Sequence, residues 1–265
     1  MKKILFLTNK NNGAFEEDSQ LIDFLSKDFE ITVSHPLDCL PLPSNAEGII
    51  IRNIWPTHEY AKEWKSIQQK IKESKIPTYN SLTGKGDINR KGYLLELSKM
   101  GYPVIPTIDN LDNLYLLEDS EYYWVKPKDG CDGSGSGKYT KEDLFKKDLK
   151  DHIIQPYIEF TSEPSFFYVD NVFSHAITTP NRLTDKDIEV YKPTEEELAF
   201  AQRFVEWNTL GHGIQRIDAV KTKEGKLLLT EVEDLCPYLY IDDIDLETKK
   251  VFLEKVAMSL KMLLM

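Results

Sequence analysis

The sequence predicts an α/β fold at the start of the chain and an α+β fold in the remainder. Over about the first eighty residues, short apolar runs alternate with stretches of helical spacing, a pattern typical of a parallel sheet covered by helices. Beyond residue 120, alternating segments come in pairs separated by short polar turns, which is typical of antiparallel hairpins. A polar run rich in glycine, residues 127–137, interrupts this second region.

The first region contains apolar runs of strand length and amphipathic stretches of helix length. The expected strands are residues 4–8, 30–34, 48–52 and 76–79, and the expected helices are residues 16–25 and 62–74. In the second of these helices Trp64, Ile67 and Ile71 form one apolar stripe. Residues 83–89 carry two glycines and are interpreted as a linker.

The second region mixes helices with short strands. A helix over residues 90–100 is expected to stop at Gly101 and Pro103, and another begins with Thr194 as N-cap and Glu197 completing a capping box. The other expected elements are strands 122–126 and 153–155, hairpins 165–169 with 172–177 and 213–221 with 226–232, and helices 194–210 and 246–264.

Composition and charge exclude several classes of protein. Hydrophobic residues make up 41% of the 265 residues, which argues against disorder. Lys and Arg total 33 against 44 Asp and Glu, so the net charge of −11 disfavours nucleic acid and anionic membranes as partners. The three cysteines (Cys39, Cys131 and Cys236) are too scattered for a disulfide framework, and no apolar run reaches membrane-spanning length. We therefore expect a cytoplasmic protein.

The hairpin near the C-terminal third of the chain concentrates acidic residues. Arg216 and Asp218 are two residues apart and share one face of their strand, as do Glu231 and Glu233 on the next. A two-residue turn at 224–225 places Asp218 opposite Glu231 and Arg216 opposite Glu233. A four-residue loop keeps this register, whereas a three-residue loop shifts it.

Opposed carboxylates repel each other unless a cation compensates them. Directly opposed residues have Cβ atoms roughly 4.5–5.5 Å apart. Arg216 offsets one negative charge, and the remaining excess within an otherwise apolar hairpin favours a divalent cation such as magnesium. The alternative is an exposed acidic strand that holds no metal.

Lysines and glycines of the second region suit a polyphosphate. Lys126 ends a strand, and Gly133, Ser134 and Gly135 follow in a loop whose free backbone N–H groups would fold closely over phosphate. Lys91 precedes that strand and would converge with Lys126 on the same phosphates. Considered alone, the loop has the pattern of a flexible surface loop. Each lysine, considered alone, is typical of a solvated surface charge.

The segment after strand 153–155 has groups that suit a purine and a ribose. The backbones of Tyr157 and Ile158 and the side-chain amide of Gln155 offer donors and acceptors to the edge of a base. Glu163 would accept two ribose hydroxyls. The alternative is an ordinary turn after an edge strand.

In their order along the chain, these segments resemble the ATP-grasp superfamily of carboxylate–amine ligases. The nearest branch is similar to glutathione synthetase and the cycloserine-forming cyclo-ligase, through IRNIWP, FSHAITTP and EVEDLCPYLY. The resemblance implies a pre-ATP-grasp domain (1–82), an N-lobe with a glycine-rich lid (83–154) and a C-lobe with the metal site (155–265). The matching segments are NRKGYLLELSKMGYPVIPT with Lys91, WVKP with Lys126, DGCDGSGSG, QPYI, Glu163, Arg216-Ile217-Asp218 and Glu231-Val232-Glu233.

The resemblance implies ATP as cosubstrate and two Mg²⁺ ions, for which Mn²⁺ substitutes, held by Asp218, Glu231 and Glu233. Many members have Asn where this chain has Glu233, so the second metal site is left open. The implied reaction joins a small-molecule or peptide carboxylate to an amine through an acyl-phosphate. Arg216 would stabilise the transferred phosphoryl group, and Arg182 would grip the acceptor carboxylate.

Two other functions stay open from the sequence alone. One is an ATP-binding sensor or scaffold without ligase activity, and the other is a small-molecule phosphoryl transferase. His175 is interpreted as a strand histidine, while Arg52 and Trp55 are candidates for substrate contact or for capping. The amphipathic C-terminal helix serves either as core or as a homodimer interface.

Overall fold

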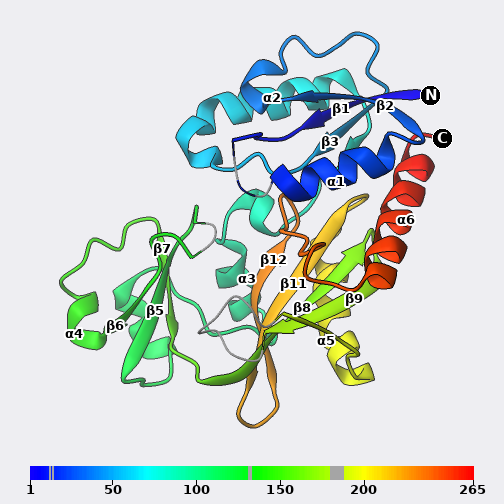
Figure 1. Cartoon of the computed structure of the whole chain (residues 1–265). Helices are drawn as coiled ribbons and strands as arrows, with labels where there is room; N and C mark the ends of the chain where they lie inside the picture. The colour runs from blue at the N-terminus through cyan, green and yellow to red at the C-terminus, as the bar shows by residue number, and fades with distance from the viewer. Residues whose placement is uncertain (12, 14, 131–132, 180–187) are drawn as a thin grey trace.

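The computed structural model describes residues 1–11, 13, 15–130, 133–179 and 188–265, and within this part of the chain the strands form three sheets. Figure 1 shows the first sheet at the top, the smallest sheet at the lower left and the largest sheet in the middle, with the C-terminal helix along the opposite side. Among the described residues, no helix combines the length and the apolar character needed to cross a bilayer.

The first sheet is parallel, in the order β2-β1-β3-β4. Ile4, Phe6 and Ile50 pack on one face with helices α1 and α6, while Leu5 and Leu7 pack on the other with α2. Burial on both faces explains the apolar runs without alternation. The predicted α/β region is confirmed in these elements: β1 (Lys2–Leu7), α1 (Phe15–Leu25), β2 (Phe29–Ser34), η1 (Pro36–Asp38), β3 (Gly48–Ile51), η2 (Thr57–Tyr60), α2 (Ala61–Ser74) and β4 (Thr78–Tyr79).

The smallest sheet is antiparallel, in the order β6-β5-β7. The glycine-rich run connects β5 to β6, and the pairing of Trp124 with Lys138 brings both ends of that run together. The helix expected at 90–100 begins only at Tyr93, after a turn in which Arg90 has a positive φ. The elements are η3 (Asp87–Asn89), α3 (Tyr93–Lys99), η4 (Leu111–Leu116), β5 (Tyr122–Pro127), β6 (Gly137–Thr140), α4 (Lys141–Leu144) and β7 (His152–Pro156).

The largest sheet is antiparallel, in the order β10-β9-β8-β11-β12. The predicted capping box at the start of α5 is confirmed, since Thr194 and Glu197 bond to each other's backbone N–H groups. The elements are β8 (Phe160–Val169), β9 (Val172–Thr179), β10 (Glu189–Tyr191), α5 (Glu195–Asn208), β11 (Ile214–Thr222), β12 (Leu227–Glu233) and α6 (Leu246–Leu263).

In the acidic hairpin of β11 and β12, the predicted cross-strand residue pairs are present, but the loop that was expected to produce them is not. Asp218 lies opposite Glu231 and Arg216 opposite Glu233. The loop, however, has three residues rather than two or four, because Thr222 N–H bonds to the Lys226 carbonyl and Gly225 takes a φ of 81°. That loop shifts the register by one residue, and a β-bulge next to Asp218 shifts it back.

The first and largest sheets share one hydrophobic core and are also joined by the hydrogen bonds of one buried asparagine side chain. Residues of α6, such as Phe252 and Val256, pack in the same cluster as β1 of the first sheet and Ile214 of β11. The buried side chain of Asn80, directly after β4, donates to the Ile214 carbonyl at 2.6 Å and to the Asp234 carbonyl at 2.9 Å. The ends of β4, β11 and β12 are therefore held together.

Candidate functional site

A cavity of about 260 Å³ lies between the smallest sheet and the largest sheet. Side chains of β5 and β7 form one wall, and those of β8, β11 and β12 form the other. Most of the site residues predicted from the sequence line this cavity. They are Lys126, Gly133, Gln155, Tyr157, Ile158, Glu163, Arg216, Asp218, Glu231 and Glu233.

The remaining predicted residues lie elsewhere. Lys91 does not line the cavity itself, but its ammonium reaches Glu231 on the cavity wall. Ser134 and Gly135 belong to the glycine loop, where Ser136 N–H bonds to the Gly133 carbonyl at 3.0 Å. Gly135 has a φ of 73°, and a Cβ there would lie 2.8 Å from Pro127 Cγ, so the turn requires glycine. Arg182 lies outside the described residues.

Glu231 is paired with two lysines from distant parts of the chain. Its Oε2 lies 2.7 Å from Lys91 Nζ and its Oε1 lies 3.1 Å from Lys126 Nζ. Burial alone would raise the pKa of Glu231, but the two ammonium groups hold that pKa well below its usual range. Lys91 and Lys126 thus come together at an acid of the β12 strand, and their convergence on phosphate stays a prediction.

Arg216 is held in a fixed orientation by two carboxylates and a carbonyl. Its guanidinium makes a bidentate contact with Asp218 at 2.8 Å, donates to Glu233 Oε1 at 2.8 Å and donates to the Tyr238 carbonyl at 2.7 Å. The ring of Tyr240 lies 5.4 Å from the guanidinium carbon. Both oxygens of Asp218 therefore contact Arg216, and each retains a further lone pair that a metal could use.

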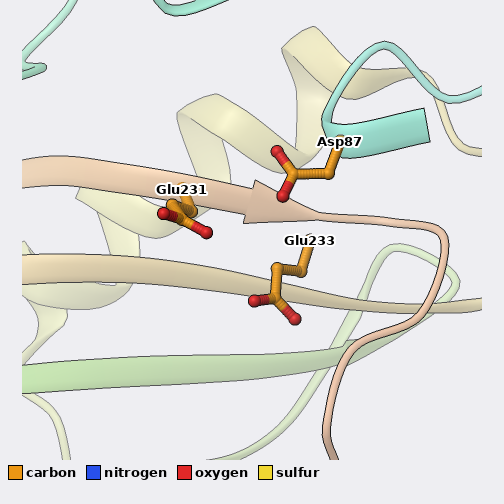
Figure 2. A group of neighbouring side chains, drawn as sticks. All are labelled: Asp87, Glu231 and Glu233. Atoms are coloured by element: carbon orange, nitrogen blue, oxygen red, sulfur yellow. The ribbon is translucent and has the colours of Figure 1, made fainter. Parts of the chain in front are cut away.

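A third acid beside Glu231 and Glu233 was missed by the sequence analysis. Asp87 comes from η3, within the segment interpreted as a linker, and its carboxylate lies next to the two glutamates (Figure 2). Ligand oxygens of the three side chains lie within 4.8 Å of one another. The available signal was the spacing of Asp87 four residues before Lys91, to which it is paired at 3.0 Å.

These residues fit a divalent cation of the magnesium type. All three side chains offer carboxylate oxygens, the donors that magnesium prefers. The Asp87 carboxylate is paired with Lys91 at 3.0 Å and interacts with the buried Tyr93 side chain. Burial and the neighbouring acids Asp218, Glu231 and Asp87 raise the pKa of Glu233 to about 8, against the opposing effect of Arg216. A cation at this position would offset the charge of the clustered acids and favour the ionised form of Glu233.

Away from the acids and lysines, the cavity is lined mainly by apolar side chains. Ile105, Phe160 and Val220 line it together with Ile158. This end matches the flat, apolar surface of a purine.

Two of the predicted purine contacts are altered by neighbours. The Gln155 amide nitrogen donates to Thr107 Oγ1 at 2.9 Å. The Tyr157 N–H was expected to stay free for a ligand, which is wrong: it donates to the Tyr122 carbonyl at 2.9 Å, because the chain continues alongside β5 after β7.

Two candidates from the rest of the sequence have structural roles. Arg52 is 1% exposed, pairs with Asp18 at 3.0 Å and donates to the Pro237 carbonyl, so it does not contact a ligand in this cavity. His175 stacks on Phe167 at a centroid distance of 4.5 Å, and burial lowers its pKa to about 4. The interpretation of His175 as a strand histidine rather than a base agrees with this packing.

No protein-family model matches the sequence, and no curated protein matches it either. Solved structures do match over almost the whole chain. D-cycloserine synthetase DcsG has a TM-score of 0.76 at 19% identity, with 97% of this chain and 99% of that chain covered.

Two further structures have comparable similarity. An ATP-grasp ligase associated with a ribosomally synthesised peptide from Chryseobacterium gregarium, in complex with ADP and a leader and core peptide, has a TM-score of 0.71 at 13% identity, covering 99% and 97% of the two chains. The D-alanine–D-alanine ligase of Bacillus anthracis, in complex with ATP, has a TM-score of 0.69 at 15% identity and 99% coverage of each.

At these identities the comparisons establish the fold, which is that of the ATP-grasp ligases. The resemblance stated from the sequence motifs is confirmed at this level. Of the structures named above, one is a cycloserine synthetase, from the branch that the motifs indicated.

Proposed function

We propose that the protein is an ATP-dependent ligase that activates a carboxylate as an acyl-phosphate and transfers the acyl group to an amine. The observation that carries this proposal is the meeting of Lys126, Arg216 and Glu231 at one cavity, where Lys91 reaches Glu231 from behind the cavity wall. Three of these side chains come from separate strands, β5, β11 and β12, and Lys91 comes from the turn before α3; all four are buried or half-buried. A set of charges of both signs at a partly apolar cavity fits a magnesium-bound triphosphate.

In this proposal ATP lies along the cavity with its adenine at the apolar end. The purine packs against Ile158 and its apolar neighbours, with Gln155 and Tyr157 at the edge of the base, and Glu163 binds the ribose. Lys91 and Lys126 neutralise phosphate oxygens, as ammonium groups do well. The loop that contains Gly133, Ser134 and Gly135 covers the phosphates, because it brings backbone N–H groups close to them.

Magnesium would be held by Glu231 and Glu233, with Asp218 as the further predicted acid, and would neutralise charge on the β- and γ-phosphates. A bare triphosphate would bring its negative charges against the acids Asp218, Glu231 and Glu233, which explains a metal requirement.

The chemistry needs no side-chain nucleophile. A carboxylate is a poor acyl donor because an attacking amine would have to displace an oxide ion, which is a poor leaving group. In the first step a carboxylate oxygen bonds to the γ-phosphorus and the bond from that phosphorus to the β,γ-bridging oxygen breaks, releasing ADP. In the second step the amine attacks the acyl carbon, the bond to phosphate breaks and the nitrogen loses a proton. Arg216, fixed by Asp218 and Glu233, stabilises charge on the transferred group.

Two classes of carboxylate substrate are proposed, small molecules and peptides. The similar structures include a cycloserine synthetase and a ligase bound to a leader and core peptide. Both a small-molecule carboxylate and a peptide side-chain carboxylate are therefore substrates to screen. Arg182, proposed from the sequence as the grip on the acceptor carboxylate, is tested by the same screen with Arg182→Ala.

Two measurements test the proposed function. A thermal shift with ATP and Mg²⁺ detects binding, because a ligand specific for the folded state raises its stability. Release of ADP and phosphate is then followed over a panel of amino acids and peptides. Nucleotide binding without phosphate release on any substrate would indicate a sensor, and ADP with a stable phosphorylated product would indicate a phosphoryl transferase.

Variants locate the activity at the cavity. Asp218→Asn and Glu231→Gln should abolish magnesium-dependent turnover, while Glu224→Gln, an exposed acid in the turn of the same hairpin, should retain it. Full activity in both cavity variants would contradict the assignment of the metal acids.

A further inference from the structure

The segment that follows the acids of β12 is held by buried charged side chains of the first region. Arg52, which is 1% exposed, donates to the Pro237 carbonyl at 2.8 Å. Glu17, which is 2% exposed, accepts the N–H of Leu239 at 2.7 Å and the N–H of Ile241 at 3.2 Å. The side chains of Leu239 and Ile241 are fully buried in the core shared with α1 and α6. The segment from Pro237 to Ile241 is therefore fixed in position by the first region.

Tyr240 lies within this segment, and its side chain lines the cavity. Its ring meets that of Tyr238 edge-on at a centroid distance of 4.7 Å. Its backbone has a φ of 53°, in the left-handed region that a bulky residue occupies only where the surrounding structure imposes it. The bonds of Glu17 to the N–H groups on both sides of Tyr240 impose it here. The fold thus holds this ring at the cavity against a backbone preference.

Two groups of the segment contact Arg216, the ring of Tyr240 and the carbonyl of Tyr238. The guanidinium carbon of Arg216 lies 5.4 Å from the centroid of the Tyr240 ring, within the range of a cation–π interaction. The ring of Phe167, on β8, lies 5.9 Å from the same carbon. Nη1 of Arg216 donates to the Tyr238 carbonyl at 2.7 Å. The segment therefore determines the direction of Nη1.

Nη1 is the part of the Arg216 guanidinium that can still bind a ligand. A guanidinium has five N–H groups. The one on Nε and the two on Nη2 bond to Asp218 and Glu233, and one on Nη1 bonds to the Tyr238 carbonyl. In the described part of the chain, this leaves the second N–H of Nη1 for a ligand in the cavity. Asp218 and Glu233 are also proposed metal ligands, and carboxylates that share their charge with a metal attract a guanidinium less strongly. The contacts from the segment do not depend on the metal.

We propose that Tyr240 is a positioning residue for Arg216, and that Glu17 holds it in place from the first region. The proposal rests on the proposed function, in which Arg216 stabilises the transferred phosphoryl group. The ring of Tyr240 and the carbonyl of Tyr238 aim the remaining N–H of Nη1 at that group when metal is bound to the acids. Among the described residues, none of the first region lines the cavity, so its effect on phosphoryl transfer passes through Tyr240.

The test compares the affinity of the full chain for ADP in the presence of Mg²⁺, with and without aluminium fluoride, by calorimetry. Aluminium fluoride beside ADP mimics the transferred phosphoryl group, so it should tighten ADP binding to the unmodified protein through Arg216. Tyr240→Leu should lose about tenfold of this tightening, as expected for loss of a desolvated cation–π contact, and should bind ADP alone unchanged. Tyr240→Phe, which keeps the ring, should retain the tightening. Tyr115→Leu, at an exposed tyrosine of η4, is the matched control.

Glu17→Gln tests the second half of the proposal and covers the case in which Tyr240→Leu does not fold. It should reduce the tightening by aluminium fluoride and leave the affinity for ADP alone unchanged, whereas Glu16→Gln, at an exposed acid, should change neither. Full tightening in Tyr240→Leu, or an equal loss in Tyr240→Phe, would overturn the role of the ring. Full tightening in Glu17→Gln would overturn the role of Glu17.

The same titrations separate this proposal from the proposed function. Failure of ADP to bind the unmodified protein would overturn both together. Binding of ADP with no effect of aluminium fluoride on the unmodified protein would overturn the positioning role alone, because Arg216 would then not contact the transferred group.

Discussion

Glu17 is a buried carboxyl that connects the first region to the cavity. The substitution Glu17→Gln measures how this carboxyl makes the stability of the protein depend on pH. Glu17 is 2% exposed and accepts the N–H of Leu239 at 2.7 Å and the N–H of Ile241 at 3.2 Å. These two residues flank Tyr240, whose ring packs beside Arg216. The substitution keeps the size of the side chain, but replaces one acceptor oxygen with an NH₂ group that opposes a backbone N–H.

The expected magnitude follows from the pKa of Glu17. Burial raises this pKa from its usual 4.5 to about 7, against the opposing effects of Arg52 and the two backbone N–H groups. At about 1.4 kcal/mol per pH unit, the difference corresponds to about 3 kcal/mol of unfolding free energy. Because the folded state holds the proton more tightly, this stability is fully present below about pH 4.5 and is lost as the pH rises through 7.

The assay is urea unfolding of the unmodified protein and Glu17→Gln, followed by tryptophan fluorescence between pH 4.5 and pH 8. The stability of the unmodified protein relative to the variant should fall by about 3 kcal/mol over this range, because glutamine does not titrate. Glu16→Gln, an exposed acid at the neighbouring position, should leave the pH dependence unchanged. Parallel curves for the unmodified protein and Glu17→Gln would show that Glu17 does not titrate in this range in the folded protein.

Three further predictions concern the cavity. Lys126→Ala should weaken ATP binding by about tenfold or more in calorimetry, as expected for loss of a charged phosphate contact, whereas Lys128→Ala should not. Glu231→Gln should lower the unfolding free energy by about 3 kcal/mol in urea, because Lys126 is then left without its carboxylate; an unchanged value would contradict the pairing. Gly86→Ala should weaken Mn²⁺ binding in the presence of the ATP analogue by displacing the segment packed on β12, and Gly92→Ala, whose Cβ would meet nothing within 4 Å, should not.

Local patterns predicted the elements and the face that each residue occupies. The apolar runs of the parallel sheet, the capping box of α5 and the two-residue spacing of Glu231 and Glu233 depend on neighbouring residues, and all are present in the structure. The register of the hairpin agreed only because two departures cancel, a three-residue loop and a bulge beside Asp218. Neither departure has a clear signal in the sequence of the strands.

Long-range contacts account for what the sequence analysis missed. Asp87 lies in a glycine-containing segment that was interpreted as a linker, and it becomes part of the site only because Asp234, far along the chain, binds the backbone on both sides of it. The Tyr157 N–H is used by the Tyr122 carbonyl for the same kind of reason. Arg52 was a substrate candidate by position, and its burial against Asp18 depends on the packing of α1.

We propose that a magnesium-bound triphosphate occupies the cavity between the smallest and largest sheets. A crystal structure with a nonhydrolysable ATP analogue and Mn²⁺, with anomalous scattering recorded at the manganese edge, tests it most directly. We expect an anomalous peak coordinated by Glu231 and Glu233, with Lys126 within hydrogen-bond distance of a phosphate oxygen. An analogue bound elsewhere, or acids that contact no manganese when the analogue is present, would contradict it.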